Sequence, residues 1–325
     1  MVGLMSDGVG FRESIPPALD GERIDRVVSL LADVSRNRAA AALAAGRVSV
    51  GDEVVYQRSR RVHEGDDLVV TGFEREAEHV PGPEPSVRFG VLYVDDDVLV
   101  VDKPSGLVVH PGAGNQTGTL VNGLLSSHPE IAGVGSAARP GIVHRLDLGT
   151  SGALAVARTQ VAYDSLVAQL ADRSVGRRYQ ALAWGRFEAA KGVVDAPVGR
   201  SPRDRTRMAV VGSGRPARTG YEVSASWATP EVSLVTCRLE TGRTHQIRVH
   251  LSAIGHPLVG DGTYGGERSG LVSERPFLHA AHLSFDHPVS GERLEFDSPL
   301  PKDLREILDG LGEPEPSDQL ADPAG

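Results

Sequence analysis

The 325-residue sequence contains a single cysteine, Cys237, which excludes an intramolecular disulfide and any zinc site built on several cysteines. No apolar run approaches the roughly 18 residues that a membrane-spanning helix needs. The first eleven residues lack a basic segment followed by an apolar stretch, so they do not resemble a secretory signal. These absences predict a cytoplasmic protein that does not associate with a membrane.

The motifs of the common nucleotide and cofactor enzymes are also absent. The glycines within residues 112–118 do not have the dinucleotide-binding spacing, and no glycine-rich run ends in Lys-Ser or Lys-Thr as a phosphate loop does. His144, Arg145 and Asp147 resemble the catalytic loop of a protein kinase, but a leucine separates the arginine from the aspartate and no Asp-Phe-Gly follows. The sequence therefore excludes these classes of enzyme.

Lysine is scarce, because only three of the 34 basic residues are lysine. The formal net charge of −9 disfavours a polyanionic partner, but the acidic residues concentrate in residues 74–84, 95–97 and the tail after Leu311. Arginines cluster in residues 58–61 and 200–207, and an arginine fork binds phosphate and stacks on bases. Each cluster is either a solvated surface or a nucleic-acid-binding patch.

The length of the chain predicts two domains. Residues 1–14 are expected to be a flexible N-terminus and residues 15–73 a small domain. Its expected elements are a helix over residues 23–32, a second helix capped by Ser35 and ended by Gly46, a hairpin around Gly51-Asp52 and a strand over residues 68–70. A core this small favours a binding module over a catalytic domain.

Residues 74–87, which hold three prolines and several acids, are expected to form a linker, and residues 312–325 a flexible acidic tail. Residues 88–311 alternate between strands and helices, with frequent hairpins, which predicts an α+β fold with a mainly antiparallel mixed sheet. The expected strands cover residues 91–94, 98–101, 153–157, 179–184, 232–239, 277–285 and 294–296, and the expected helices cover residues 119–127, 160–171, 244–255, with Thr244 as the cap, and 304–311.

One carboxylate, Asp147, lies in a polar turn between glycines within residues 141–152. Glycines let the backbone come close to a ligand. A hydrolytic glycosidase usually needs two carboxylates, whereas a single one suits a covalent step in which nothing is lost to water. The alternative is an aspartate that caps the turn through hydrogen bonds to its own backbone.

A second polar group follows in residues 239–250, where His245 and Arg248 lie three residues apart on one side of the expected helix. An arginine there can pair with a carboxylate and keep it ionised. The alternative is a solvated helix face. Tyr179 on an expected strand either packs in the core or stacks on an extruded base.

Five segments match, in order, the motifs of a known enzyme family: residues 102–112, 144–152, 178–179, 241–250 and 256–261. They resemble the RluA/RluD family of pseudouridine synthases, and most of all its RluD type, which modifies large-subunit ribosomal RNA. The resemblance covers about residues 88–310. It implies the pseudouridine synthase catalytic fold for this part of the chain.

Residues 23–70 resemble the small αL RNA-binding domain that precedes the catalytic domain in many RluD-type enzymes. The matching residues are Arg23-Ile24-Asp25, Ser35-Arg36, Gly46-Arg47-Val48 and Gly65-Asp66. The resemblance implies RNA contacts from the N-terminal domain through Arg23, Arg36, Arg47 and Arg58.

The resemblance also implies roles at the catalytic site. Asp147 would be the nucleophile, Tyr179 would stack on the target uracil and take or guide its proton, and Arg248 would pair with Asp147. Arg145 would enter the space that the flipped base leaves. The substrate-binding set would include His144 and Thr150 of the same motif and Leu278 beneath the uracil.

The sequence departs from the family pattern at Leu148-Gly149, where a Lys-Asp pair is common. This departure concerns RNA contacts around the loop rather than the reaction.

The expected function is therefore the isomerisation of uridine to pseudouridine in structured RNA, with base flipping and without a cofactor or a metal, because nothing is gained or lost overall. The expected substrate is large-subunit ribosomal RNA in pre-ribosomal particles, transfer RNA is the alternative, and the protein is expected to be a monomer. A non-catalytic ribosome-assembly factor is a second hypothesis, which the presence of Asp147, Tyr179 and Arg248 together disfavours.

Overall fold

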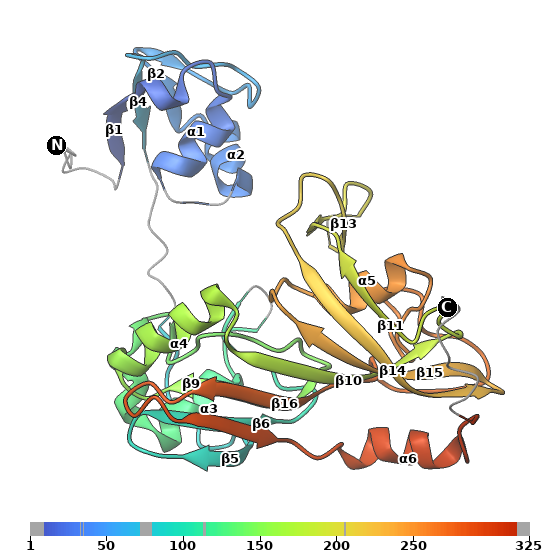
Figure 1. The fold of residues 1–325 in the computed structure, drawn as a ribbon. Coiled ribbons are helices and arrows are strands. Elements are labelled where there is room, and N and C mark those ends of the chain that lie inside the picture. Colours follow the sequence, from blue (N-terminus) through green and yellow to red (C-terminus); the bar gives the residue numbers. More distant parts are fainter. Residues whose placement is uncertain are drawn as a thin grey trace. The chain divides into compact units, whose positions relative to one another are not determined.

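The computed structural model describes residues 10–32, 34, 36–71, 80–112, 115–204 and 206–316 (Figure 1). The chain divides into two compact units, Met1–Glu78 and His79–Gly325. Each unit has hydrophobic core clusters of its own. Among the described residues, no helix is both long and apolar enough to cross a membrane.

The smaller unit packs two helices on a sheet whose described strands have the order β1-β4-β2-β3. Its elements are β1 (Phe11–Ser14), η1 (Pro17–Leu19), α1 (Ile24–Leu31), α2 (Arg36–Ala44), β2 (Val48–Val50), β3 (Glu53–Val54) and β4 (Asp67–Val70). The helices bury Ile24, Val28 and Leu43 against Leu68 of the sheet. Gly46 follows α2 at a φ of +69°, in the left-handed region that favours glycine. Both predicted helices and the hairpin are confirmed.

The structure differs from the sequence prediction at the start of this unit. Residues 11–14, which were expected in a flexible N-terminus, form β1 and pair antiparallel with β4. The sequence Phe-Arg-Glu-Ser has no run of large apolar residues, so this strand is specified by its pairing with β4 rather than by its own hydrophobic pattern. Ser35, the expected helix cap, and residues 1–9 lie outside the described part of the chain.

The larger unit is built on a mixed, mainly antiparallel sheet, which confirms the α+β prediction. Its nine described strands have the order β11-β14-β15-β10-β16-β9-β6-β5, with β17 also paired to β16. Of the pairs along this order, β16 with β9 is parallel. The strands are β5 (Gly90–Val94), β6 (Val98–Lys103), β9 (Ser151–Ala157), β10 (Gly176–Trp184), β11 (Lys191–Asp195), β14 (Arg218–Ala228), β15 (Glu231–Leu239), β16 (Leu278–Asp286) and β17 (Arg293–Asp297).

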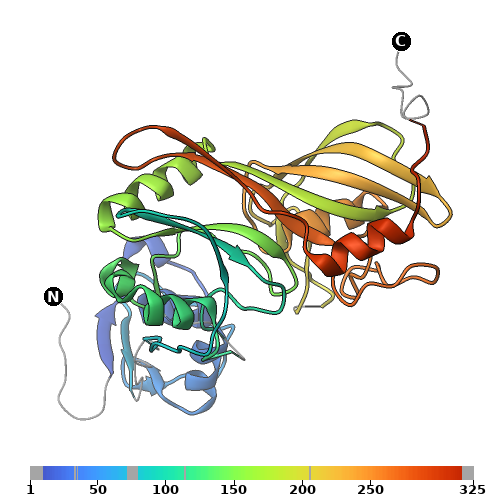
Figure 2. The same cartoon turned by 90° about the horizontal axis from the view of Figure 1, so that it is seen from below.

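Helices flank both halves of this sheet. Figures 1 and 2 show α3 and α4 beside the half with β5, β6 and β9, and α5 and α6 beside the half with β14 and β15. The remaining elements are α3 (Leu120–Ser127), η2 (Pro129–Gly133), β7 (Gly135–Ser136), β8 (Arg139–Pro140), α4 (Gln160–Asp172), β12 (Val198–Arg200), β13 (Met208–Val210), α5 (Gln246–Ala253) and α6 (Lys302–Gly310). The predicted helices are confirmed, whereas β11 to β14 were not predicted.

Two segments expected to be irregular are attached to this unit where they are described. In the expected linker, the Glu84 side chain accepts the Gly118 N–H and the Glu84 N–H donates to the Asn122 carbonyl. In the expected tail, the Gly312 carbonyl accepts the Trp227 indole N–H. Each of these bonds has a backbone group on at least one side, so a composition rich in proline and acids did not reveal them.

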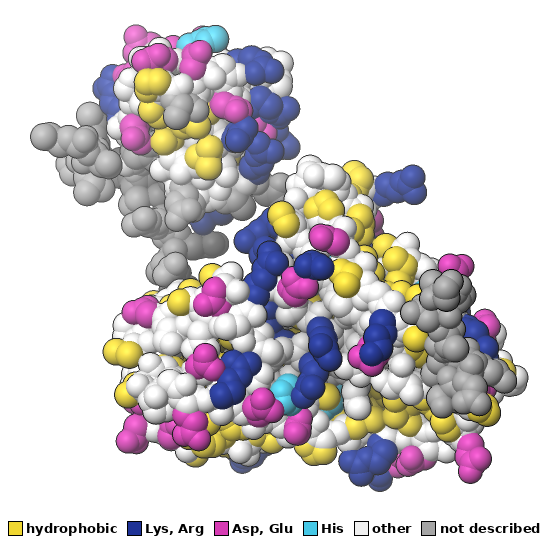
Figure 3. Space-filling model, in the orientation of Figure 1, with side chains coloured by type: hydrophobic (Ala, Val, Ile, Leu, Met, Phe, Trp, Pro, Cys, Tyr) yellow, Lys and Arg dark blue, Asp and Glu magenta, His cyan; other side chains and the backbone are white. Residues whose placement is uncertain are grey.

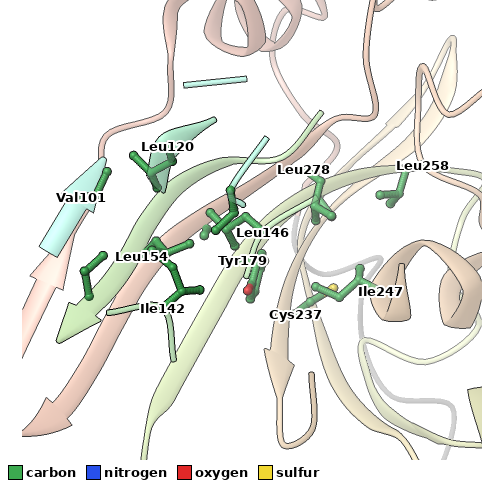
Figure 4. Packing of buried hydrophobic residues seen from close by; sticks show 14 of the residues in the cluster. Val101, Leu120, Ile142, Leu146, Leu154, Tyr179, Cys237, Ile247, Leu258 and Leu278 are labelled. Atoms are coloured by element: carbon green, nitrogen blue, oxygen red, sulfur yellow. The ribbon is translucent and has the colours of Figure 1, made fainter. Parts of the chain in front are cut away.

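The central core joins the two halves of the sheet, and Figure 4 shows Tyr179 within it. Leu154 and Ile142 pack on one side, and Cys237 and Ile247 pack on the other. Cys237 is fully buried, as expected of a small apolar side chain. The core therefore fixes the middle of β10, which carries Tyr179.

Candidate active site

A cavity of about 590 Å³ lies in the larger unit. Its wall is formed by residues 142–150, the end of α4, the start of β10 and residues 239–247. Among the described residues that line it, six are arginines and two are carboxylates. Figure 3 shows basic side chains gathered on this face of the unit between α4 and α5. The cavity is therefore cationic although the whole chain is acidic.

Asp147 lies on the loop between β8 and β9, and its side chain is 17% exposed. The turn is closed by its backbone, because the Thr150 N–H donates to the Asp147 carbonyl over 3.0 Å. Within the described part of the chain, no backbone N–H donates to its carboxylate. The carboxylate is therefore free for a ligand, which argues against a role as a turn cap.

Arg248 of α5 brings a guanidinium next to this carboxylate. Its Nη1 lies 3.7 Å from Oδ2 of Asp147, while its Nε and Nη2 donate to the fully buried Asp261 over 2.7 and 2.8 Å. Burial lowers the pKa of Arg248, but the hydrogen bonds and the charge of Asp261, together with Asp147, raise it overall. Arg248 and Asp147 are therefore neighbours, as expected, but the carboxylate that Arg248 binds through hydrogen bonds is that of Asp261.

Tyr179 lies on β10 in the same wall and is almost completely buried. Burial raises the pKa of Tyr179 to about 12, against the charge of Arg177, which lowers it, and with a smaller contribution from Asp147. The phenol is therefore protonated at neutral pH. It can stack on a base or donate a hydrogen bond, and it is a poor general base.

The other expected residues of the loop lie in the cavity wall with different surroundings. The His144 Nε2 accepts the Ala155 N–H over 2.9 Å, and burial lowers the pKa of His144 to about 3, with a further contribution from Arg177. His144 is therefore neutral and attaches the loop to β9. Thr150 and Leu278 are buried and line the cavity.

Arg145 is exposed at the cavity and forms no hydrogen bond or ion pair with another described residue. It is two residues from Asp147, so both side chains reach the same cavity. No described contact pairs Arg145 with a nearby acid that would fix the turn.

Lys103 was not given a role from the sequence, although it lies in a matched motif. It is fully buried at the end of β6, and its ammonium donates to the Pro104 and Leu107 carbonyls over 2.9 Å each. Burial lowers the pKa of Lys103 to about 7, against the opposing charge of Asp147. Its third acceptor, at 3.5 Å, is the Leu148 carbonyl. A lysine at the end of a strand whose residues 98–101 are all apolar was the available signal.

The loop that departs from the family pattern is thus held by its backbone. The Gly149 carbonyl accepts hydrogen bonds from the Ser105 hydroxyl over 3.2 Å and from Arg275 over 2.9 Å. Together with Lys103 at Leu148, these donors reach carbonyl oxygens, which every residue type has. Replacement of the common Lys-Asp pair therefore leaves these contacts in place.

His245, rather than the expected Thr244, precedes the first turn of α5, and it has a φ of +57°. Its Nδ1 lies 2.8 Å from the Tyr264 hydroxyl, which accepts the Met208 N–H. The tyrosine hydrogen has no other acceptor among the described residues, so it goes to Nδ1 and the His245 proton resides on Nε2. The Tyr264 ring also lies 5.0 Å from the Arg248 guanidinium.

In the smaller unit, the expected RNA-binding arginines differ in their contacts. Arg23 forms two hydrogen bonds with Asp25, at 3.0 and 2.9 Å, so its guanidinium is already paired. Arg36, Arg47 and Arg58 are exposed.

The family model, the similar sequences and the similar structures all point to one protein family. The model of the RNA pseudouridylate synthase family matches residues 97–253. The ribosomal large subunit pseudouridine synthase D of Pseudomonas aeruginosa is 43% identical over 317 residues, which cover 94% of this chain and 96% of that protein. The RNA pseudouridine synthase YlyB of Bacillus subtilis is 44% identical over 291 residues, covering 89% and 94% respectively.

Among solved structures, the human RNA pseudouridylate synthase domain containing protein 1 superposes with a TM-score of 0.53 at 30% identity. The match covers 72% of this chain and 99% of that one. Identity over nearly the whole length, a shared fold and a cationic cavity that holds the Asp147 carboxylate point the same way, and the chain belongs to the RluD type of the RNA pseudouridine synthase family.

Proposed function

We propose that this RNA pseudouridine synthase isomerises specific uridines of large-subunit ribosomal RNA. The observation that carries the proposal is Asp147, an accessible carboxylate held beside Arg248 in a cationic cavity. A cavity rich in arginine suits an RNA substrate. Relatives named for the ribosomal large subunit support the choice of RNA. Pre-ribosomal particles in the cytoplasm, and a monomeric enzyme, complete the proposal.

In the proposed reaction, Asp147 is the nucleophile that begins the rearrangement. The bond between C1′ of ribose and N1 of uracil breaks, the uracil turns, and C5 bonds to C1′ while the C5 hydrogen is lost and N1 gains one. Attack on C1′, attack on C6 and removal of the 2′ proton all start from an ionised carboxylate. The Arg248 guanidinium lies 3.7 Å from that carboxylate and places a positive charge beside it.

Tyr179 and Leu278 are proposed to hold the extruded uracil. Both line the cavity, and the tyrosine ring offers a π face to the base. Because the pKa of Tyr179 is raised to about 12, it is proposed to guide a proton by hydrogen bonding rather than to remove one. His144 and Thr150 are proposed to shape the loop next to the nucleotide.

Arg145→Ala is expected to impair base flipping rather than bond rearrangement. Opening a stack costs a few kcal/mol, and a planar guanidinium can fill the gap that the base leaves. The Arg145 side chain, which pairs with no other described residue, can do this. Single-turnover rates should therefore fall more, by about tenfold, on a stem-embedded uridine than on one in an unpaired bulge. Equal losses on both substrates would remove Arg145 from base flipping.

The smaller unit is proposed to add RNA affinity rather than chemistry. Deleting residues 1–78 should weaken binding to folded RNA and flatten its salt dependence, while isomerisation persists at high RNA concentration. Replacing Arg36, Arg47 and Arg58 by glutamine should reproduce the loss, because each phosphate contact releases counterions. Arg26→Gln is the control, since Arg26 is not among the residues that the resemblance implies in RNA binding. A folded deletion variant that is inert at saturating RNA contradicts this division.

The choice among RNA substrates is tested in the cell. Pseudouridines are mapped in total RNA from a strain lacking this gene and from the same strain carrying the wild-type gene or Asp147→Asn. The proposal expects specific large-subunit sites that return only with the wild type. Sites restored on transfer RNA instead would favour that substrate. Sites that both genes restore, or none lost, would favour a non-catalytic assembly factor.

A further inference from the structure

Arg177, a buried charged side chain of the cavity wall, forms no ion pair with a described residue. Arg177 lies on β10 two residues before Tyr179, so both point to the same side of the strand. It is 7% exposed and lines the cavity. Its Nη2 donates to the Leu239 carbonyl over 3.3 Å, and its Nε is buried without a hydrogen-bond partner. Nη1 has no acceptor among the described residues and is not fully buried.

A buried guanidinium without a carboxylate is unfavourable, because desolvation of the charge is not offset by an ion pair. Burial lowers the pKa of Arg177, in keeping with that cost. A methionine or leucine at this position would pack in the wall without that desolvation cost. An anion delivered by the substrate is therefore the partner that Arg177 lacks.

The wall next to Arg177 is cationic as well. Arg173, Arg215 and Arg243 line the same end of the cavity. Burial lowers the pKa of Arg243, and the charges of Arg215 and Arg173 lower it further, so these like charges lie close together. Glu240 is the acid of this end and is already bonded to Arg173 over 3.1 Å. Positive charge remains for a ligand.

We propose that Arg177 binds a phosphate that flanks the flipped uridine. The phosphate would lie at the arginine end of the cavity while the uridine lies at the Asp147 end. Nη1 of Arg177 donates to a phosphate oxygen, and Arg243 and Arg215 supply further positive charge. A role of Arg177 in lowering the pKa of Tyr179 explains the buried arginine less well. The pKa of Tyr179 is about 12 even though Arg177 lies two residues away.

The test combines one arginine variant with one neutral phosphate. Each of the two phosphates that flank the target uridine is replaced in turn by an uncharged methylphosphonate. On the natural RNA, Arg177→Met should lower kcat/KM by about 10- to 100-fold, the usual effect of losing a hydrogen bond to a charged group. For wild type, one methylphosphonate should cause a similar loss. In Arg177→Met that same methylphosphonate should cause almost none.

Arg178→Met is the matched control, because Arg178 is the next residue, is exposed and lies on the opposite face of β10. It should respond to the methylphosphonates as the wild type does. Arg177→Lys, which restores the charge but not the fork, should recover part of the loss. The slope of log affinity against log salt should also fall by about one in Arg177→Met.

The measured coupling decides the proposal. If neither methylphosphonate loses its effect in Arg177→Met, Arg177 does not hold a flanking phosphate. A loss in Arg177→Met that is equal on charged and neutral RNA, with an altered pH profile, would assign the arginine to Tyr179 instead. Circular dichroism of each variant keeps a folding defect separate from either outcome.

Discussion

Asparagine in place of Asp147 is expected to lower kcat by at least about 10⁴-fold, as losses of a nucleophile do in other enzymes. The amide has the shape of the carboxylate but lacks its charge and its nucleophilicity. RNA affinity should stay nearly unchanged, because a carboxylate is not a phosphate ligand. Release of tritium from C5 of labelled uridine measures the reaction, since that hydrogen is lost when C5 bonds to ribose.

A second aspartate of the same unit serves as the control for this substitution. Asp164→Asn changes an exposed aspartate of α4 that bonds to Gln160, and it should retain wild-type turnover. Both variants are compared in RNA affinity and in circular dichroism. Turnover near the wild-type rate by a folded Asp147→Asn protein would refute the assignment of the nucleophile.

The sequence predicts the fold best where side-chain patterns are regular. The alternating or continuous apolar runs of β6, β9 and β15 and the amphipathic α4 were all expected, and each is present. β14 was missed, because residues 218–228 mix small and polar residues with few large apolar ones. Such a strand is specified by its two neighbours, β11 and β15, and neither pairing is visible in one sequence.

The residues of the active site were likewise predicted only in part. Motifs place Asp147, Tyr179 and Arg248, and the structure brings these three side chains to one cavity or its edge. The roles of Lys103 and Asp261 were not predicted, because both act by holding other segments of the site, Lys103 the carbonyl of Leu148 and Asp261 the guanidinium of Arg248. A charged residue that follows an apolar run or lies beside glycines indicates burial, but its hydrogen-bond partner is known only from the folded structure.

Removing Arg248 is expected to be the most destabilising single change at the site. Arg248→Met leaves the fully buried Asp261 without its cation, and breaking a buried ion pair in this way costs about 3–5 kcal/mol. Both tryptophans of the chain, Trp184 and Trp227, lie in the larger unit, so their fluorescence in a urea titration reports on that unit. Activity should be lost as well, because the guanidinium beside Asp147 is gone.

A second substitution separates stability from chemistry. Asp261→Asn removes the unpaired charge but keeps an oxygen to accept the Thr263 and Tyr264 N–H groups. The double variant Arg248→Met with Asp261→Asn should therefore regain most of the lost free energy of unfolding. It should remain inactive, because the guanidinium that lies 3.7 Å from Asp147 is gone. If the double variant regained turnover together with stability, Arg248 would serve the fold through Asp261 and have no part in the reaction at Asp147.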